Sequence, residues 1–389
     1  MVYLFVFILI FIGIVVYDIS NHKRNKVLYF TSIFLIMSFV SGLSYRLGTD
    51  MIAYSKEYYL YKSLFDIDDV FYFFSIHNRE PLWVFISSFF RTFGLPFFIF
   101  HLFQVCVVNF AVCRIFKERT GCKFISILVY LILIFTQFNY EIMRESFSVS
   151  IFLFSYNYLL KSQYLKYYLF STIAIGFHIS AIILFFLPIV KLLPKGLLGG
   201  VLVLACCILL LVLGDIFKMQ MLSILDVDFL SEKASGYFSS DRYSSSKWNI
   251  SYLLNLSFYL VLPMLIYCYY YKKRNFQKID IFCIVSAYMF VYTCTIIFPI
   301  FYRINNYFII FFIVYIVEIY SIKLYTKYIY NIFLNCAGIL LLLLFLGFKF
   351  YNVYLQPMAE SSELSYRRYY PYSSIFAQDT DNVRERIYN

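Results

Sequence analysis

The chain has 389 residues, of which 62% are hydrophobic and 14% are charged, and its formal net charge is +11. An ordinary soluble domain carries about 25% charged residues, so this composition excludes a soluble globular protein and predicts that lipid surrounds most of the chain. The basic residues lie in short connectors between apolar runs, a pattern typical of membrane topology, so no nucleic acid is expected as a partner.

Apolar runs with the length of a membrane span recur along the chain. We count about twelve, within a range of 11 to 13, and predict an all-α, polytopic integral membrane protein. A single transmembrane helical domain is expected over residues 1–349, followed by a polar, tyrosine-rich C-terminal tail over 350–389. The runs cover residues 2–17, 27–43, 81–95, 96–115, 124–139, 145–160, 165–190, 197–214, 251–271, 279–298, 302–322 and 328–349.

Two of these regions contain residues that interrupt helices. Arg91, Gly94 and Pro96 divide residues 81–115 into two pieces, one of which could be re-entrant or interfacial where protein covers its backbone. A second break is expected near Gly176 and His178. Both breaks are needed to reconcile the number of crossings with the charge of the loops.

The charge distribution predicts the topology. Five connectors hold 15 of the 33 Lys and Arg residues and are assigned to the cytoplasm. The two long loops, 44–80 and 215–250, have no basic excess, so we expect them to face outward. None of the nine cysteines lies in either loop, and no external disulfide framework is expected. The connectors are Asp18–Lys26, Arg114–Lys123, Lys161–Lys166, Lys272–Lys278 and Lys323–Lys327.

Charged side chains at or near membrane depth need partners or a water-filled cavity, so they indicate candidate sites. The loop 44–80 begins with Tyr45-Arg46-x-Gly48-Thr49-Asp50, continues with Tyr54, and ends with Arg79-Glu80-Pro81-Leu82-Trp83. These residues could form a polar site beside one membrane face. They could equally form a capped amphipathic helix with solvated charges.

Three further features follow along the chain. Glu141, Arg144 and Glu145 have helical spacing and could form either a site or an ion pair at a helix start. His178 lies in an apolar stretch, where an imidazole needs a partner and is either structural or catalytic. Tyr302-Arg303 begins a later run, where Arg303 could also snorkel to the headgroups.

In this order, the motifs resemble the EpsG family of bacterial membrane proteins, the Wzy-like polysaccharide and O-antigen polymerases. The resemblance covers most of the chain. Glu145 stands where the family commonly has glutamine. The motifs are Tyr45-Arg46-x-Gly48-Thr49-Asp50 with Tyr54, Glu80-Pro81-Leu82-Trp83, Met143-Arg144-Glu145-Ser146, Phe177-His178-x-Ser180-Ala181 with Pro188, and Tyr302-Arg303.

The resemblance implies a multi-pass glycosyltransferase of the bacterial inner membrane. It would transfer a glycan from undecaprenyl diphosphate to the next lipid-linked repeat unit, in O-antigen, capsule or exopolysaccharide biosynthesis. Arginine forks can neutralise diphosphate oxygens, so neither a metal nor a cofactor is expected. The candidate diphosphate contacts are Arg144, Arg303, Arg46 and Arg79. His178 fits the general base best by residue type, with Asp50 and Glu80 as rivals that could instead bind sugar hydroxyls. The candidate sugar contacts are Tyr45, Tyr54, Trp83 and Tyr302.

Two alternatives stay open at this point. A lipid-linked oligosaccharide flippase or exporter is expected to show pseudo-symmetric halves and charges at the membrane midplane. An O-antigen ligase or a membrane acyltransferase would share the carrier or the layout but use another acceptor. The expected partners are the lipid bilayer, the undecaprenyl-diphosphate-linked oligosaccharide, and a chain-length regulator and a flippase of the same pathway.

Overall fold

The computed structural model describes residues 2–66, 79–192, 197–224, 254–264, 276–298, 301–323, 343–355, 358–361, 364–366 and 368–378. These parts are helical, as predicted, apart from one antiparallel hairpin of β1 (Met358–Ser361) and β2 (Leu364–Tyr366) and isolated bridges. The chain divides into two compact units. Unit 1 comprises Met1–Ile182 with Tyr320–Asn389, and unit 2 comprises Ile183–Ile319.

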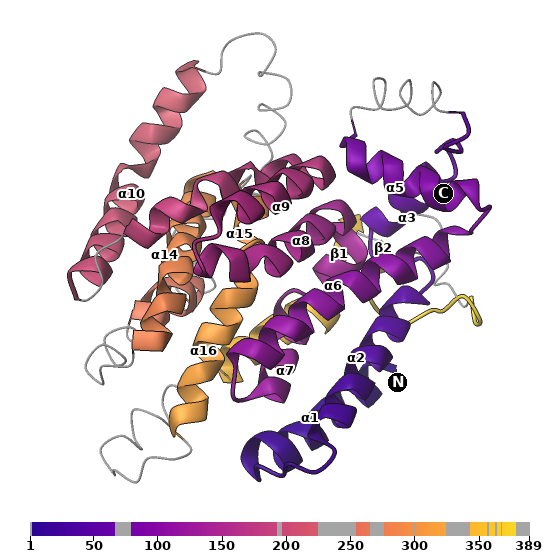
Figure 1. Cartoon of the computed structure of the whole chain (residues 1–389), viewed down its shortest axis with the longest axis horizontal. Helices are drawn as coiled ribbons and strands as arrows, with labels where there is room; N and C mark the ends of the chain where they lie inside the picture. Colours follow the sequence, from indigo (N-terminus) through magenta and orange to yellow (C-terminus); the bar gives the residue numbers. More distant parts are fainter. Residues whose placement is uncertain are drawn as a thin grey trace. The chain divides into compact units, whose positions relative to one another are not determined.

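Unit 1 is built on a row of helices. In it α2 (Lys26–Gly42), α6 (Phe97–Arg119), α8 (Met143–Leu160) and α9 (Tyr164–Phe177) pack in succession (Figure 1). The helix α1 (Val2–Gly13), which continues as the π-helical segment η1 (Ile14–Ile19), packs against α2 and against α7 (Lys123–Leu133). Gly42 lets α2 approach α6 closely, because a Cβ at this position would lie 2.5 Å from Leu102.

Both predicted helix breaks in unit 1 are confirmed. The first break lies after α5 (Pro81–Thr92), at Gly94, which has a φ of +65°. Glycine adopts this left-handed conformation without a steric cost, and Pro96 then precedes α6. Helix α9 ends at Phe177, and His178 is extended, with φ −158° and ψ 128°, before the 3-10 helix η3 (Ile179–Phe185).

Polar contacts join the predicted cytoplasmic connectors at one end of unit 1. The carboxylate of Asp18 accepts a hydrogen bond from the amide of Phe124 at 2.7 Å. The guanidinium of Arg119 donates to the side chain of Asn157, in the last turn of α8, at 2.6 Å. The connectors 18–26 and 114–123 therefore lie together with the end of α8.

Helix α6 leads from this end to the opposite one. Its first residue, Phe97, donates its amide to the hydroxyl of Tyr59, which follows α3 (Asp50–Tyr58). The 23 residues of α6 span about 34 Å, close to the roughly 30 Å hydrocarbon core of a bilayer. The segment around α3 thus lies about one membrane thickness away from the basic connectors.

Two helices in the described part of the chain are long and apolar enough to cross a membrane by themselves, Val2–Ile19 and Phe97–Arg119. Shorter apolar helices occur elsewhere, and parts of the predicted runs 251–271 and 328–349 fall outside the described residues. The prediction of about twelve crossings therefore remains a prediction. The shorter helices are Lys26–Gly42, Lys123–Leu133, Ile179–Leu192, Leu198–Gly214, Leu254–Met264, Ile281–Ile297 and Leu343–Leu355.

Unit 2 pairs α10 (Leu197–Ile224) with α14 (Phe276–Ile297). Gly214 packs against Ile297 at this contact, where a Cβ would lie 2.8 Å away. Helix α10 continues to Ile224, so the predicted loop 215–250 begins with helical residues, and the rest of it, 225–250, lies outside the described residues. The other elements are η4 (Leu187–Leu192), the π-helical η6 (Ser257–Val261), α15 (Tyr302–Asn305) and α16 (Ile309–Lys323); η8 (Tyr351–Leu355) belongs to unit 1.

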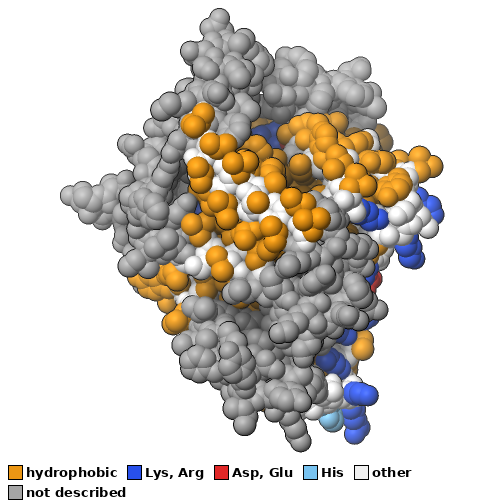
Figure 2. Space-filling view, turned by 90° about the vertical axis from the view of Figure 1, so that its left-hand side faces the viewer, with side chains coloured by type: hydrophobic (Ala, Val, Ile, Leu, Met, Phe, Trp, Pro, Cys, Tyr) orange, Lys and Arg blue, Asp and Glu red, His pale blue; other side chains and the backbone are white. Residues whose placement is uncertain are grey.

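Hydrophobic side chains remain on the surface of these helices. Val201, Ile208 and Val212 of α10 are each more than half exposed. Viewed from the side on which α10 lies in Figure 1, the described surface is mainly hydrophobic, with Lys and Arg near its margin (Figure 2). Large exposed apolar areas of this kind are typical of a lipid-facing surface.

Candidate functional site

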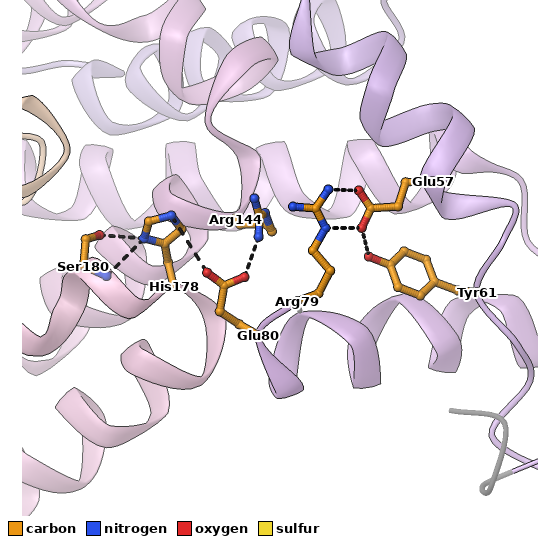
Figure 3. Close-up of polar contacts among 7 residues, drawn as sticks. All are labelled: Glu57, Tyr61, Arg79, Glu80, Arg144, His178 and Ser180. Atoms are coloured by element: carbon orange, nitrogen blue, oxygen red, sulfur yellow. Dashed lines mark hydrogen bonds and ion pairs between the residues drawn. The ribbon is translucent and has the colours of Figure 1, made fainter. Parts of the chain in front are cut away.

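Glu80 is placed at the site by the start of α5. Pro81 occupies the first position of this helix, where its missing N–H costs no hydrogen bond. The residue before a proline is restricted to extended backbone, and Glu80 accordingly has φ −65° and ψ 137°. Its carboxylate forms no cap on α5. Oε2 instead accepts a hydrogen bond from Nη1 of Arg144 at 2.5 Å (Figure 3).

Arg144 and His178 are held together by the contact between α8 and α9. The hydroxyl of Ser148, one turn after Arg144, donates to the carbonyl of Ala174 at 2.7 Å. The rings of Phe147 and Phe177 lie 4.7 Å apart next to this bond. These contacts fix the first two turns of α8 against the last turn of α9, and His178 directly follows the end of α9.

Helix α5 packs on α9 through a glycine contact. A Cβ at Gly176 would lie 2.6 Å from Cδ1 of Leu82, a distance that real side chains do not adopt. Glu80 is two residues before Leu82, and His178 is two residues after Gly176. The close approach therefore sets the distance between the carboxylate and the imidazole, whose Oε1 and Nε2 atoms are 4.0 Å apart.

The hydrogen bonds of His178 determine its tautomer. The amide of Ser180 donates to Nδ1 at 3.2 Å, and the hydroxyl of Ser180 lies 2.6 Å from the same nitrogen (Figure 3). An amide can only donate, so Nδ1 is an acceptor and the proton of the neutral ring is on Nε2, facing Glu80. The side chain of His178 is 6% exposed, while those of Glu80 and Arg144 are 15% exposed.

A second arginine, Arg79, lies beside Glu80 and Arg144, but two of its donor nitrogens are already paired with another carboxylate. Arg79 donates from Nε and Nη2 to the two carboxylate oxygens of Glu57, at 2.8 and 2.7 Å (Figure 3). Tyr61 donates its hydroxyl to the same carboxylate at 2.5 Å. Burial, and the negative charge of Glu57, raise the pKa of Tyr61, so this hydroxyl stays protonated. The planar fork of Arg79 is thus occupied. Arg144 donates Nη1 to Glu80 and also bonds the hydroxyl of Tyr54, while its Nε has no hydrogen-bond partner.

Aromatic side chains border the Arg144 guanidinium. Cζ of Arg144 lies 5.9 Å from the ring centre of Tyr54, which is within range of a cation–π interaction. The ring of Tyr54 meets Trp83 edge to face at 5.9 Å. Burial raises the pKa of Tyr54, although the nearby charge of Arg144 opposes this shift. Tyr54 is therefore a neutral hydroxyl at the edge of the site.

The carboxylate of Glu141 binds the start of α3 and has a structural role there. Its Oε2 accepts hydrogen bonds from the hydroxyl of Thr49 at 2.7 Å and the amide of Asp50 at 3.1 Å. The start of a helix favours an anion because its amides are unpaired. Gly48 has a φ of +79°, and a Cβ there would lie 2.9 Å from Oε1 of Glu141. The Gly-Thr-Asp motif is thus needed for this contact.

Residues of the C-terminal segment also contact Glu141 and the beginning of the loop 44–80. Tyr369 donates its hydroxyl to Oε1 of Glu141 at 2.9 Å. The carbonyls of Arg368 and Ser373 accept the amides of Gly48 and Tyr45, at 3.2 and 2.9 Å. The predicted tail therefore includes a segment, 368–378, that packs against the beginning of the loop 44–80.

The structure brings together six of the predicted site residues in unit 1: Tyr54, Arg79, Glu80, Trp83, Arg144 and His178. Asp50 is the first residue of α3, one turn before Tyr54. Tyr45 and Arg46 line a separate pocket, and Tyr302 and Arg303 belong to α15 of unit 2.

Sequence analysis missed two members of the group, Glu57 and Tyr61. Glu57 lies three residues after Tyr54 on α3, a spacing that places both on one face of the helix and could have identified Glu57, whereas Tyr61 follows the end of α3 and had no such signal.

Among the described residues, no three His, Cys, Asp or Glu side chains are arranged so that they could hold a metal ion. In a comparison with known protein families, the model of the EpsG family matches residues 27–374, nearly the whole chain. No curated protein and no solved structure matches the chain.

Proposed function

The chain belongs to the EpsG family, a Wzy-like polymerase family, and we propose that it is a membrane polysaccharide polymerase. Its reaction would move a growing glycan from undecaprenyl diphosphate to a hydroxyl of the next lipid-linked repeat unit. The observation that carries this proposal is the group of Glu80, Arg144 and His178, which places a carboxylate between a guanidinium and an imidazole. The aromatic rings of Tyr54 and Trp83 beside it suit a sugar substrate.

The reaction requires one bond to form and one to break. The acceptor hydroxyl oxygen bonds to the anomeric carbon of the carrier-linked sugar, and the bond from that carbon to the diphosphate oxygen breaks. The carrier diphosphate leaves with the electron pair. The hydroxyl proton passes to a general base. The site must therefore stabilise new negative charge on the diphosphate and accept one proton.

Arg144 is the proposed diphosphate contact in unit 1. One of its nitrogens, Nη1, donates to Glu80, and Nε has no hydrogen-bond partner. Arg79 is a weaker candidate because Glu57 already occupies its fork. The low solvent exposure of Arg144 strengthens its electrostatic effect on a bound anion. Arg303 remains a second proposed contact on the basis of the family resemblance.

Glu80 is the proposed general base. Sequence analysis favoured His178 by residue type, but the tautomer set by Ser180 leaves the proton of the neutral ring on Nε2. That nitrogen is a donor and cannot accept the hydroxyl proton. His178 would instead orient the Glu80 carboxylate, or the acceptor hydroxyl, by donating a hydrogen bond. Asp50, at the start of α3, would contact sugar hydroxyls.

The proposed setting is the bacterial inner membrane, with about twelve crossings and the site on the outward face. The outward side is supported by the separation between this site and the basic connectors at the other end of α6. In this proposal, the lipid-linked repeat units are synthesised on the cytoplasmic side of the membrane. A flippase would deliver them, and a chain-length regulator would act on the product.

The test is chain growth on purified lipid-linked repeat units, followed on a gel. The wild-type chain should produce a ladder of products. Glu80→Gln should lower the rate by at least 100-fold, the range expected for loss of a general base. Arg114→Lys is the matched control, since Arg114 forms an exposed pair with Glu118 at the opposite end of unit 1.

Other outcomes would support the alternatives. Single transfer of a finished glycan to a different acceptor would indicate a ligase. Movement of the lipid-linked substrate across a vesicle membrane, without chain growth, would indicate a flippase. A Glu80→Gln variant that still forms the full ladder would exclude Glu80 as the base.

A further inference from the structure

A pocket of about 450 Å³ lies in unit 1 beside α3. Its lining contains two cations, Arg46 and Lys56, and no carboxylate. It also contains five aromatic rings, among them Tyr45, Tyr59 and Phe376. A pocket of this size could hold one or two sugar rings, and its lining is positive and aromatic.

The pocket uses the face of α3 that is turned away from the polar group of Glu80 and Arg144. Ile52, Ser55 and Lys56, followed by Tyr59, line it, and these positions recur with the spacing of one helical face. Tyr54 and Glu57 project to the other side, where they contact Arg144 and Arg79. One short helix therefore separates the pocket from the proposed site of glycosyl transfer.

Several contacts hold the walls of the pocket in place. Arg46 has a left-handed backbone, with φ 49°, and its guanidinium lies 5.3 Å from the ring centre of Tyr45. Non-glycine residues in this region are uncommon, and they persist only where the surrounding structure fixes them. The hydroxyl of Tyr59 accepts the amide of Phe97 at 3.4 Å. The ring positions are therefore built into the fold.

The C-terminal segment provides the remaining wall. The amide of Ile375 donates to the carbonyl of Leu43 at 3.0 Å, which anchors the segment next to Ser44. Phe376 and Gln378 follow directly and line the pocket. Phe376 is 82% exposed, so its ring is accessible at the edge of the pocket. A ring presented in this way is suited to stacking on a ligand.

We propose that this pocket binds an acidic sugar residue of the glycan, such as a uronic acid. The C–H face of a pyranose would stack on Tyr59 and Phe376, because the negative face of an aromatic ring attracts the polarised C–H groups. Arg46 and Lys56 would neutralise the sugar carboxylate. The inference rests on the proposed function, since it identifies the pocket as a glycan subsite across α3 from the site of transfer.

The test is binding to the purified full-length chain in phosphatidylcholine nanodiscs, measured by calorimetry. The acidic probe is a tetrasaccharide of alternating glucuronic acid and N-acetylglucosamine, and the neutral probe is the N-acetylglucosamine tetrasaccharide. We expect the acidic probe to bind at least tenfold more tightly. Arg46→Gln should weaken its binding about tenfold, the effect of losing a charge-assisted hydrogen bond, and should leave binding of the neutral probe nearly unchanged.

Two further variants separate a binding role from a folding role. Phe376→Ala removes an exposed ring, so it should not perturb folding, and it should weaken binding of both probes. Lys62→Gln is the charge-matched control, because Lys62 is exposed and lies outside the pocket lining. The Lys62 variant should bind like the wild type.

Three results would overturn the proposal: wild-type binding that does not favour the acidic probe, unchanged binding in both Arg46→Gln and Phe376→Ala, or an equal loss in Lys62→Gln. Displacement of the acidic probe by anionic phosphatidylglycerol in the nanodisc would assign the pocket to a lipid headgroup and would also overturn it. None of these results changes the outcome of the Glu80→Gln assay, so failure of this inference is distinguishable from failure of the proposed polymerase activity.

Discussion

Replacing Gly176 by alanine should separate the assembly of the site from the stability of the chain. The added Cβ would lie 2.6 Å from Cδ1 and 2.7 Å from Cγ of Leu82, so α5 must move by about 0.8 Å to restore ordinary van der Waals contact. Glu80 lies at the start of α5 and moves with it. The carboxylate then shifts relative to His178, which follows α9 and stays in place.

The expected effect on activity is much larger than the effect on stability. Alanine is about 0.5–1 kcal/mol more favourable than glycine in a helix, and overpacking costs about 1–3 kcal/mol, so the free energy of unfolding should change by less than about 3 kcal/mol. A misplacement of about 1 Å in a catalytic group can lower a rate on the order of 100-fold. Chain growth should therefore fall about 100-fold while the membrane abundance of the protein stays near normal.

A matched control and a compensating substitution test the reasoning. A Cβ at Gly347 would meet no atom within 4 Å, so Gly347→Ala should have full activity. Leu82→Ala in the Gly176→Ala background removes the clash and should restore most of the rate. Normal chain growth in the single variant, or no recovery in the double variant, would show that this contact does not position Glu80.

Four further outcomes are expected. Arg144→Lys keeps the charge but loses the planar fork, so chain extension should stop with normal protein abundance; full-length polymer from this variant would move the diphosphate contact to Arg303, Arg46 or Arg79. Polymerisation by the purified chain should survive EDTA, because arginine is the proposed diphosphate partner; loss of activity with rescue by magnesium would indicate Asp50 and Glu80 as ligands. Glu141→Gln should lower the free energy of unfolding by about 1–3 kcal/mol, measured as a lower melting temperature, since the carboxylate accepts hydrogen bonds from Thr49, Asp50 and Tyr369. A cysteine at Ser63 should react with an impermeant maleimide in cells with a permeabilised outer membrane, and labelling only after lysis would reverse the proposed topology.

Local signals explain what could be predicted from the sequence. The break between α5 and α6 follows from Gly94 and Pro96, whose backbone restrictions are properties of single residues. The polar residue His178 in an apolar run marked the end of α9 in the same way. The sequence did not indicate that α10 continues through Asp215 to Ile224, because a single charged residue does not by itself end a helix.

The local sequence does not predict which side chains pair with one another in the folded chain. Glu80 and Arg144 are 64 residues apart, and nothing in their local sequences specifies that they meet. The family resemblance selected both residues but did not indicate that Glu57 would engage Arg79. The tautomer of His178 depends on the amide of Ser180, which faces the ring only because α9 ends at Phe177. Such contacts depend on the tertiary structure.

The docking of residues 368–378 onto the beginning of α3 has a consequence for the order of events during synthesis. Tyr372 donates its hydroxyl to the carbonyl of Val40, which precedes it by 332 residues. The ribosome synthesises α3, α5, α8 and α9 long before it synthesises Tyr372. The helices can pack early, but the hydrogen bond from Tyr369 to Glu141 and the pocket wall at Phe376 form only after residues 369–376 have been synthesised. The proposed site of glycosyl transfer can therefore assemble before the proposed glycan-binding pocket is complete.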